Sequence, residues 1–214
     1  MERDVALVEL NKLIGTDLRA LANELGIIVW RDVPADASLA QRLNKGWAGH
    51  TLERYLGLPL NSAQSPNFGS WELKQVSLRN RPRVGICVKE TMAITMIDPV
   101  EVSSKPFEQS HLYNKLKKIV VVARTYESQL EERSMVHSVG AFDLEEPRIF
   151  EQVKADYELV RETIRESGFS SLSGAMGKLI QPRTKGRGHG SISRAFYARS
   201  GFVAHILGLK VCKF

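Results

Sequence analysis

The stretch SPNFGSWELKQVSL, residues 65–78, decides the fold because its second half alternates like a half-buried strand. A strand has a side-chain period of two, so Glu72 and Lys74 should share one face while Trp71 and Leu73 point into packing on the other. Two further segments rich in Val, Ile and Thr cover 84–97 and 119–123. The pattern therefore predicts a central sheet that begins near residue 71.

Helical spacing of apolar residues flanks these strands, so we expect a mixed α/β domain. Residues 5–25 predict one or two helices with a break near Gly15, and Ser38 begins a capping-box pattern for a helix that ends near Leu56. The other predicted elements are a helix over 108–118, a helix from Pro147 to Gly168, a strand over 196–199 and a short helix capped by Ser200.

The length of 214 residues suits a single domain with a sizeable core, either undivided or in two lobes, over about 1–145 and about 146–214, of which the second holds the basic excess. A composition with 43% hydrophobic and 25% charged residues excludes a disordered chain, and no apolar run is long enough to span a membrane. The N-terminus lacks the pattern of a secretion signal, so we expect a cytoplasmic protein in which Cys87 and Cys212 stay reduced.

The net charge of +6 is unevenly distributed. After Glu166 the chain holds eight Lys or Arg residues and no Asp or Glu, whereas the first 166 residues hold 22 basic and 24 acidic side chains. Clustered cations interleaved with Gly, Ser and aromatic residues suit contact with phosphate groups. The C-terminal part therefore indicates a polyanionic partner, with a solvated basic tail as the alternative.

Glu72 and Lys74 together suit hydrolysis of a phosphodiester. A carboxylate can hold a divalent cation, while an adjacent ammonium orients water or stabilises charge that develops on a phosphate. Alone, the pair is also typical of an ordinary exposed strand.

The preceding segment GWAGHTLERYLG, residues 46–57, places Gly46, Gly49 and Glu53 on one helical face. Because glycines weaken a helix, their presence indicates the close approach of another backbone or of a ligand beside Glu53. An exposed Glu with incidental glycines is the alternative.

Four segments, in order along the chain, carry a family resemblance. They are GWAGHTLERYLG; SPNFGSWELKQVSL; FEQSHLYNKLKKIVVVA, residues 107–123; and LIQPRTKGRGHGSISRAFYARSGFVAHIL, residues 179–207. In this order they resemble the MutH mismatch-repair endonucleases and the related GATC-cutting type II restriction enzymes of the PD-(D/E)XK nuclease superfamily. The resemblance implies a restriction-endonuclease-like fold, with a central mixed sheet flanked by helices and a cleft that binds DNA.

The resemblance also implies roles for single residues. Glu72 would be a metal ligand, Lys74 would position or activate water, Glu53 would be an accessory carboxylate ligand, and Lys115 would approach the scissile phosphate. Without the resemblance, Lys115 is typical of the solvent face of an amphipathic helix. The residues expected to face DNA are Arg183, Lys185, Arg187, Tyr197 and Arg199, with a half-buried strand position as the alternative for Tyr197.

One departure from the family pattern concerns a metal ligand. The family has Asp where this chain has Asn67, and it commonly has a longer gap before the Glu. An amide oxygen carries no formal charge, so affinity for a hard cation should fall. Three explanations are open: an engineered change that traps a DNA complex, a natural variant served by Glu53, or a pseudonuclease. The intact Glu72 and Lys74 favour the first.

We therefore expect a monomeric, sequence-specific endonuclease that cleaves duplex DNA with Mg²⁺, for which Mn²⁺ could substitute, and that has no contact with a membrane. The divergence of the motif details from the repair proteins favours a type II restriction enzyme. One alternative is a strand-nicking mismatch-repair endonuclease that requires an activator protein. An alternative of another class is a sequence-specific DNA-binding protein without cleavage activity.

Overall fold

The strand predicted from residues 71–78 lies inside the main sheet of the protein. The computed structural model describes residues 1–32, 36–38, 42–58, 69–186 and 193–209. Strands of the first sheet follow the order β2-β1-β4-β5 and comprise β1 (Glu72–Arg81), β2 (Gly85–Val88), β4 (Lys118–Thr125) and β5 (Val136–Asp143). β1 and β4 run parallel, with Glu72 opposite Ile119, whereas β2 and β5 pair antiparallel with their neighbours.

A second sheet is built from three described strands that are antiparallel in the order β3-β7-β6. They are β3 (Met92–Met96), β6 (Ile180–Thr184) and β7 (Arg194–Ala198). The prediction of a single strand over 84–97 is therefore wrong, because β2 and β3 belong to different sheets. Apolar and β-branched composition marks both as strands but does not specify the partner of either.

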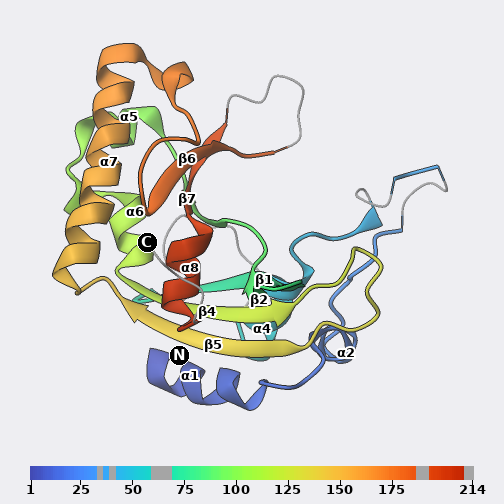
Figure 1. Cartoon of the computed structure of the whole chain (residues 1–214). Coiled ribbons are helices and arrows are strands. Elements are labelled where there is room, and N and C mark those ends of the chain that lie inside the picture. Colours follow the sequence, from blue (N-terminus) through green and yellow to red (C-terminus); the bar gives the residue numbers. More distant parts are fainter. Residues whose placement is uncertain (33–35, 39–41, 59–68, 187–192, 210–214) are drawn as a thin grey trace.

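One face of the first sheet is covered by α1 (Arg3–Lys12), α2 (Leu18–Glu24) and α4 (Trp47–Tyr55), as Figure 1 shows. The predicted break between the first two helices is confirmed. The prediction of one helix from Ser38 to Leu56 is wrong: the N–H of Arg42 bonds the Ser38 carbonyl, but Leu43 then pairs with Trp30, and α4 begins only at Trp47. Contact with the remote Trp30 overrides the local helical spacing.

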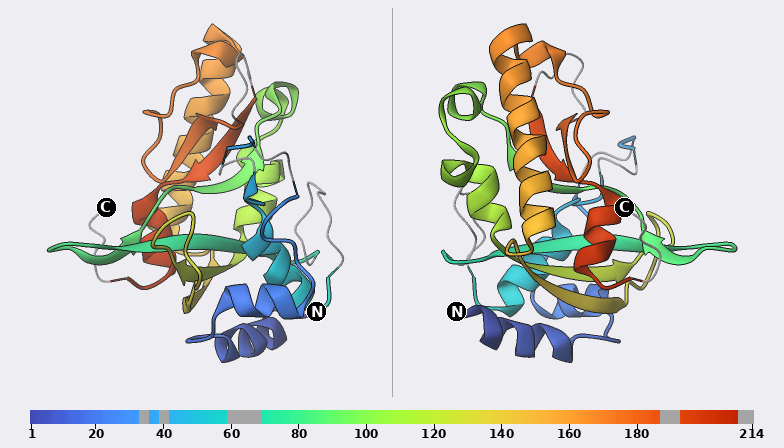
Figure 2. Two further views of the ribbon diagram at one scale, coloured as in Figure 1. Left: turned by 90° about the vertical axis from the view of Figure 1, so that its right-hand side faces the viewer. Right: turned by 60° about the vertical axis from the view of Figure 1, so that its left-hand side comes forward.

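The opposite face carries α5 (Pro99–Ser104), α6 (His111–Leu116), α7 (Pro147–Ser167) and α8 (Ser200–Ile206), with short 3₁₀ turns at Phe107–Gln109 and Phe169–Ser171. α7 confirms its prediction and stands steeply on the first sheet in Figure 2. Ser200 is the first residue of α8 rather than its cap, since Arg199 takes the N-cap position.

Two buried clusters fill the two faces of the first sheet. One joins Trp71, Leu73 and the helices α1, α2 and α4, and the other joins Val76 and Leu78 to the second sheet and to α5–α8. The mixed α/β prediction is confirmed. The division into lobes near residue 145 stays a prediction. Across the described part of the chain, no helix combines the length and apolar character needed to cross a membrane.

Candidate active site

The first two polar residues of β1 meet above the sheet. The Lys74 ammonium lies 2.5 Å from Oε1 of Glu72. Glu72 itself is only 1% exposed. Trp71 and Leu73 pack on the other side, in the cluster under α1, α2 and α4. The alternation of side chains along the strand therefore has the predicted sense.

Lys115 joins the same carboxylate from a different element. It lies in the last turn of α6, just before β4, and the parallel pairing of β1 with β4 brings that turn beside the start of β1. Its Nζ lies 3.3 Å from Glu72 Oε1, and the residue is 8% exposed. The interpretation of Lys115 as a residue on a solvent face is wrong, because the crossover through α6 turns it inward.

The centre thus holds one buried carboxylate between two ammonium groups. Lys185, at the end of β6, adds a third positive charge to this region. Partial desolvation lowers the pKa of its ammonium, although the residue is exposed at the surface, and the charges of Lys74 and Lys115 lower that pKa further.

Glu53 is half-buried on α4, which packs against the first sheet through Leu52. Gly46 is the N-cap of α4, and a Cβ at that position would meet the His50 ring at 2.9 Å. At Gly49 no atom of the described chain lies within 4 Å of an added Cβ, so the close backbone approach expected there is absent from that part of the chain. The role of Glu53 as an accessory ligand stays a prediction.

Two predicted site residues, Asn67 and Arg187, lie outside the described residues. Within the described ranges, no three His, Cys, Asp or Glu side chains gather as they would around a metal ion. Glu72 is a suitable hard oxygen donor, but its Oε1 already accepts from two ammonium groups. The described residues alone therefore fit a divalent cation only in part.

Arg183 and Tyr197 lie on adjacent strands of the second sheet. Nη1 of Arg183 donates to Thr91 Oγ1 at 2.8 Å, and its guanidinium lies 5.7 Å from the centre of the Tyr197 ring. Burial raises the pKa of Tyr197, Arg183 opposes the rise, and Glu90 adds to it. Tyr197 is a half-buried strand residue, and its contact with DNA stays a prediction.

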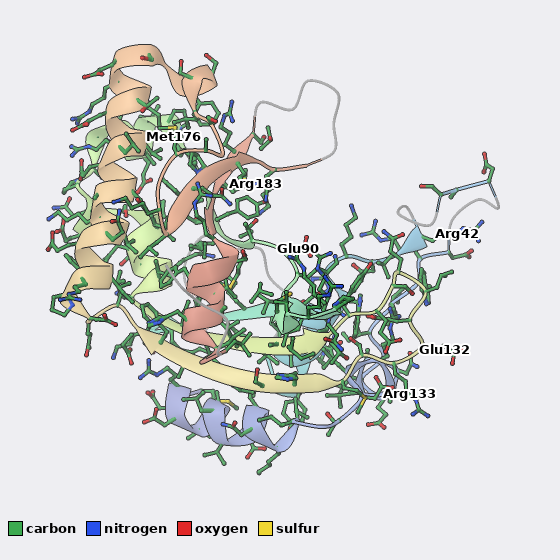
Figure 3. The ribbon with its side chains drawn as sticks, in the orientation of Figure 1. Arg42, Glu90, Glu132, Arg133, Met176 and Arg183 are labelled. Atoms are coloured by element: carbon green, nitrogen blue, oxygen red, sulfur yellow. The ribbon has the colours of Figure 1, made fainter. Side chains whose placement is uncertain are left out.

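A pocket of about 180 Å³ connects these residues with the centre, since Lys74, Glu90 and Thr91 all line it. In the view of Figure 3, Arg183, on the second sheet, lies above Glu90. The pocket thus links Lys74 with Thr91, the residue to which Arg183 donates.

Arg199 bonds the backbone of the turn that precedes β6. Its guanidinium donates to the carbonyls of Gly174, Ala175, Met176 and Gly177 at 3.0–3.2 Å. These hydrogen bonds stabilise the turn. That Arg199 faces DNA stays a prediction.

Asp156 is a residue that sequence reasoning missed. Its carboxylate, on α7, accepts hydrogen bonds from the N–H groups of Lys178, Leu179 and Ile180 at 2.7–2.8 Å. The residue is 3% exposed. The available signal was an acid within the apolar stripe of α7, beside Val153, Tyr157 and Val160. Asp156 therefore anchors the start of β6, which carries Arg183 and leads to Lys185.

Comparisons with known proteins extend the resemblance. The profile of the family described as DNA mismatch repair enzyme MutH matches residues 56–155. A DNA mismatch repair protein MutH from Vibrio cholerae is 30% identical over 223 residues, covering 94% of this chain and 93% of the relative. One from Actinobacillus pleuropneumoniae is 27% identical over 222 residues, covering 95% and 92%. Among solved structures, the restriction endonuclease MvaI with its cognate DNA aligns with a TM-score of 0.36 and 13% identity, covering 88% of this chain and 95% of that one.

Proposed function

The chain belongs to the MutH family of DNA mismatch repair enzymes, and from this premise we propose that it is an endonuclease that hydrolyses phosphodiester bonds in duplex DNA. The resemblance found in the four segments is thereby confirmed, and with it the PD-(D/E)XK class of the mixed α/β fold.

The observation that carries the proposal is the buried Glu72 carboxylate, which Lys74 and Lys115 approach from two elements. Holding a buried carboxylate against one buried and one half-buried ammonium group is costly, so this cluster is weak evidence for a purely stabilising role. The two lysines are suited to complementary roles in hydrolysis. Lys74 would orient the attacking water, and Lys115 would stabilise the negative charge that develops on the phosphate.

We propose Mg²⁺ as the cofactor, with Mn²⁺ as a substitute. Glu72 and Glu53 would hold it with carboxylate oxygens, and Asn67 would contribute an amide oxygen. When bound, the cation would polarise the phosphate and lower the pKa of a water. Because Lys74 and Lys115 already bond Oε1 of Glu72, the cation has to share this carboxylate with the two lysines.

Duplex DNA is the proposed partner of a monomeric protein. The basic excess lies after Glu166, and Arg183 bonds Thr91, which lines the same pocket as Lys74. Cations placed along one side of the catalytic centre would contact the phosphates that flank the cleaved bond.

The mismatch-repair names of the relatives favour a strand-nicking repair endonuclease that an activator protein stimulates. The type II restriction enzyme remains the other candidate, because the motif details diverge from the repair proteins. A supercoiled plasmid separates the two: a nickase yields open circles, whereas a restriction enzyme yields linear DNA.

Replacing Asn67 by Asp is expected to raise Mg²⁺-dependent cleavage of plasmid DNA by at least about tenfold. A charged ligand in place of an amide needs to lower the barrier by only about 1.4 kcal/mol for this effect. Initial rates for both proteins, measured with Mg²⁺ and with EDTA, test the expectation.

The doubly substituted protein Asn67→Asp, Glu72→Gln is the matched control and should remain inactive. Equal rates for the unmodified protein and the Asn67→Asp protein would contradict the inactivation argument. Absence of cleavage by both proteins, together with specific binding of DNA, would favour the non-cleaving DNA-binding protein.

A further inference from the structure

We propose that Glu101 is a positioning residue for Lys115: from α5 it holds the first turn of α6 and thereby keeps the Lys115 ammonium on Glu72. The inference rests on the proposed endonuclease function, in which Lys115 stabilises charge on the phosphate, and refines it. It assigns a role to a carboxylate that lies outside the candidate site and that no step of the proposed chemistry uses.

α6 is too short to be stable by itself. Its six residues, His111–Leu116, make fewer than two turns, and an isolated helix of this length does not form in water. Leu112 and Leu116 are buried in the core, but apolar packing is non-directional and does not fix a helix along its own axis. Hydrogen bonds at the ends of α6 therefore decide where Lys115 lies.

The N-terminal end of α6 is held from two elements. The first turn of a helix has backbone N–H groups without helical acceptors. The N-cap residue Ser110 accepts from the Tyr113 N–H at 3.1 Å, and Oε1 of Glu101 accepts from the His111 N–H, also at 3.1 Å. A negative charge is favourable here, because the helix dipole is positive at this end. Glu101 thus closes the end of α6 from a neighbouring helix.

His111 and Lys115 lie one turn apart on α6. Their spacing is the one at which an α-helix bonds the N–H of the later residue to the carbonyl of the earlier one, and it places both side chains on one face. The bond from Glu101 therefore acts on the turn that carries Lys115. Nζ of Lys115 lies 3.3 Å from Glu72 Oε1, near the limit of a hydrogen bond, so a small shift of that turn would break the contact.

Glu101 is itself held in place, since α5 is fastened at both ends. Asp98 Oδ1 caps its start by accepting from the Glu101 N–H, and at its other end the Tyr157 hydroxyl of α7 donates to the Lys105 carbonyl at 3.0 Å. The Glu101 side chain is 9% exposed, and the Lys105 ammonium lies 3.7 Å from its Oε1. The carboxylate therefore connects α6 with α5 and, through α5, with the long helix α7.

A positioning role differs from a purely stabilising role in one respect. If Glu101 positions Lys115, its loss should free that lysine and leave the rest of the centre in place. If Glu101 only stabilises the fold, its loss should expose every buried lysine alike, because the whole structure opens more often.

The test labels lysines with trace acetic anhydride, in EDTA and without DNA, and mass spectrometry of the peptides gives the rate at each lysine. In the Glu101→Ala protein, labelling of Lys115 should rise about fivefold, a factor that fits loss of one hydrogen bond, while labelling of Lys74 stays within about twofold. Glu101→Gln keeps an oxygen that accepts the same N–H and should keep Lys115 protected. Glu108→Ala is the matched control, because Glu108 also lies before α6 but pairs with Lys154 on the surface.

Cleavage rates give an independent measurement in proteins that carry Asn67→Asp. There Glu101→Ala should lower the single-turnover rate about tenfold, through misplacement of Lys115, while the affinity for DNA in EDTA changes by less than about threefold. In a protein that also carries Lys115→Met, Glu101→Ala should have no further effect beyond about twofold, because it acts through that lysine. Glu101→Gln should restore the rate.

Unchanged labelling of Lys115 in Glu101→Ala would overturn the inference, as would equal rises at every lysine, or losses of rate that add when Glu101→Ala and Lys115→Met are combined. Thermal melting shows whether each protein is folded. Should Glu101→Ala not fold, Glu101→Asp, which is one methylene shorter, takes its place with the same expectations. If no protein cleaves DNA, the proposed function fails, whereas the labelling still decides whether Glu101 positions Lys115.

Discussion

Replacing Lys74 by Ala, in a protein that already carries the Asn67→Asp substitution, is expected to reduce DNA cleavage by a factor on the order of 10² to 10³. Lys74 is the lysine closest to the Glu72 carboxylate, at 2.5 Å, and it lines the pocket that leads toward β6. It is therefore placed to act on the attacking water. Losing one positioned donor that stabilises developing charge has an effect of this size in other hydrolases.

The fold should tolerate this replacement. The Lys115 ammonium remains 3.3 Å from Glu72 Oε1, so the buried carboxylate keeps a cationic partner. By contrast, Glu72→Ala would leave two lysines without their shared carboxylate and would confuse an effect on stability with an effect on chemistry. Lys74→Ala is thus the more informative substitution.

Single-turnover cleavage at saturating protein gives the chemical rate, and fluorescence anisotropy in EDTA gives the affinity for DNA. The rate should fall while the affinity changes by less than about tenfold, the size of one phosphate contact. Lys154→Ala is the matched control, because Lys154 also pairs with a carboxylate, Glu108, but on the surface. A Lys74→Ala protein that cleaves within about threefold of its parent would show that the strand motif is only structural.

Replacing Asp156 by Ala is expected to lower the free energy of unfolding by about 3 kcal/mol. The substitution leaves three backbone N–H groups at Lys178, Leu179 and Ile180 without their acceptor, and each orphaned buried donor costs about 1–3 kcal/mol. The Gln152 side chain also loses its partner at 2.9 Å. Because water can enter part of the space, the sum of these costs is an upper bound.

Urea denaturation followed by circular dichroism measures this change. Asp143→Ala provides the control, since Asp143 pairs with Arg3 in a part-exposed position and such a pair contributes about 1 kcal/mol or less. Asp156→Asn, which keeps one carbonyl oxygen as an acceptor, should fall between the two. A loss of under about 1 kcal/mol for Asp156→Ala would mean that the turn before β6 keeps its conformation without the hydrogen bonds to Asp156 on α7.

Local patterns in the sequence determined the elements whose partners lie within a few residues. The two-residue alternation of Trp71, Glu72, Leu73 and Lys74 placed Glu72 and Lys74 on one face, and the apolar spacing after Pro147 predicted α7. Both periods follow from backbone geometry alone, so they can be read without knowledge of the fold. The four ordered segments likewise carried the family membership.

The tertiary structure decided which side chains meet. Only the parallel crossover from β1 through α6 to β4 turns Lys115 toward Glu72. Tertiary packing also decided that β2 and β3 lie in different sheets. It likewise brought the Asp156 carboxylate to the three N–H groups that it accepts hydrogen bonds from. These contacts join residues that are far apart in the sequence. Propensity and periodicity describe only neighbouring residues, so they cannot predict such contacts. The contacts form when whole helices and strands pack together.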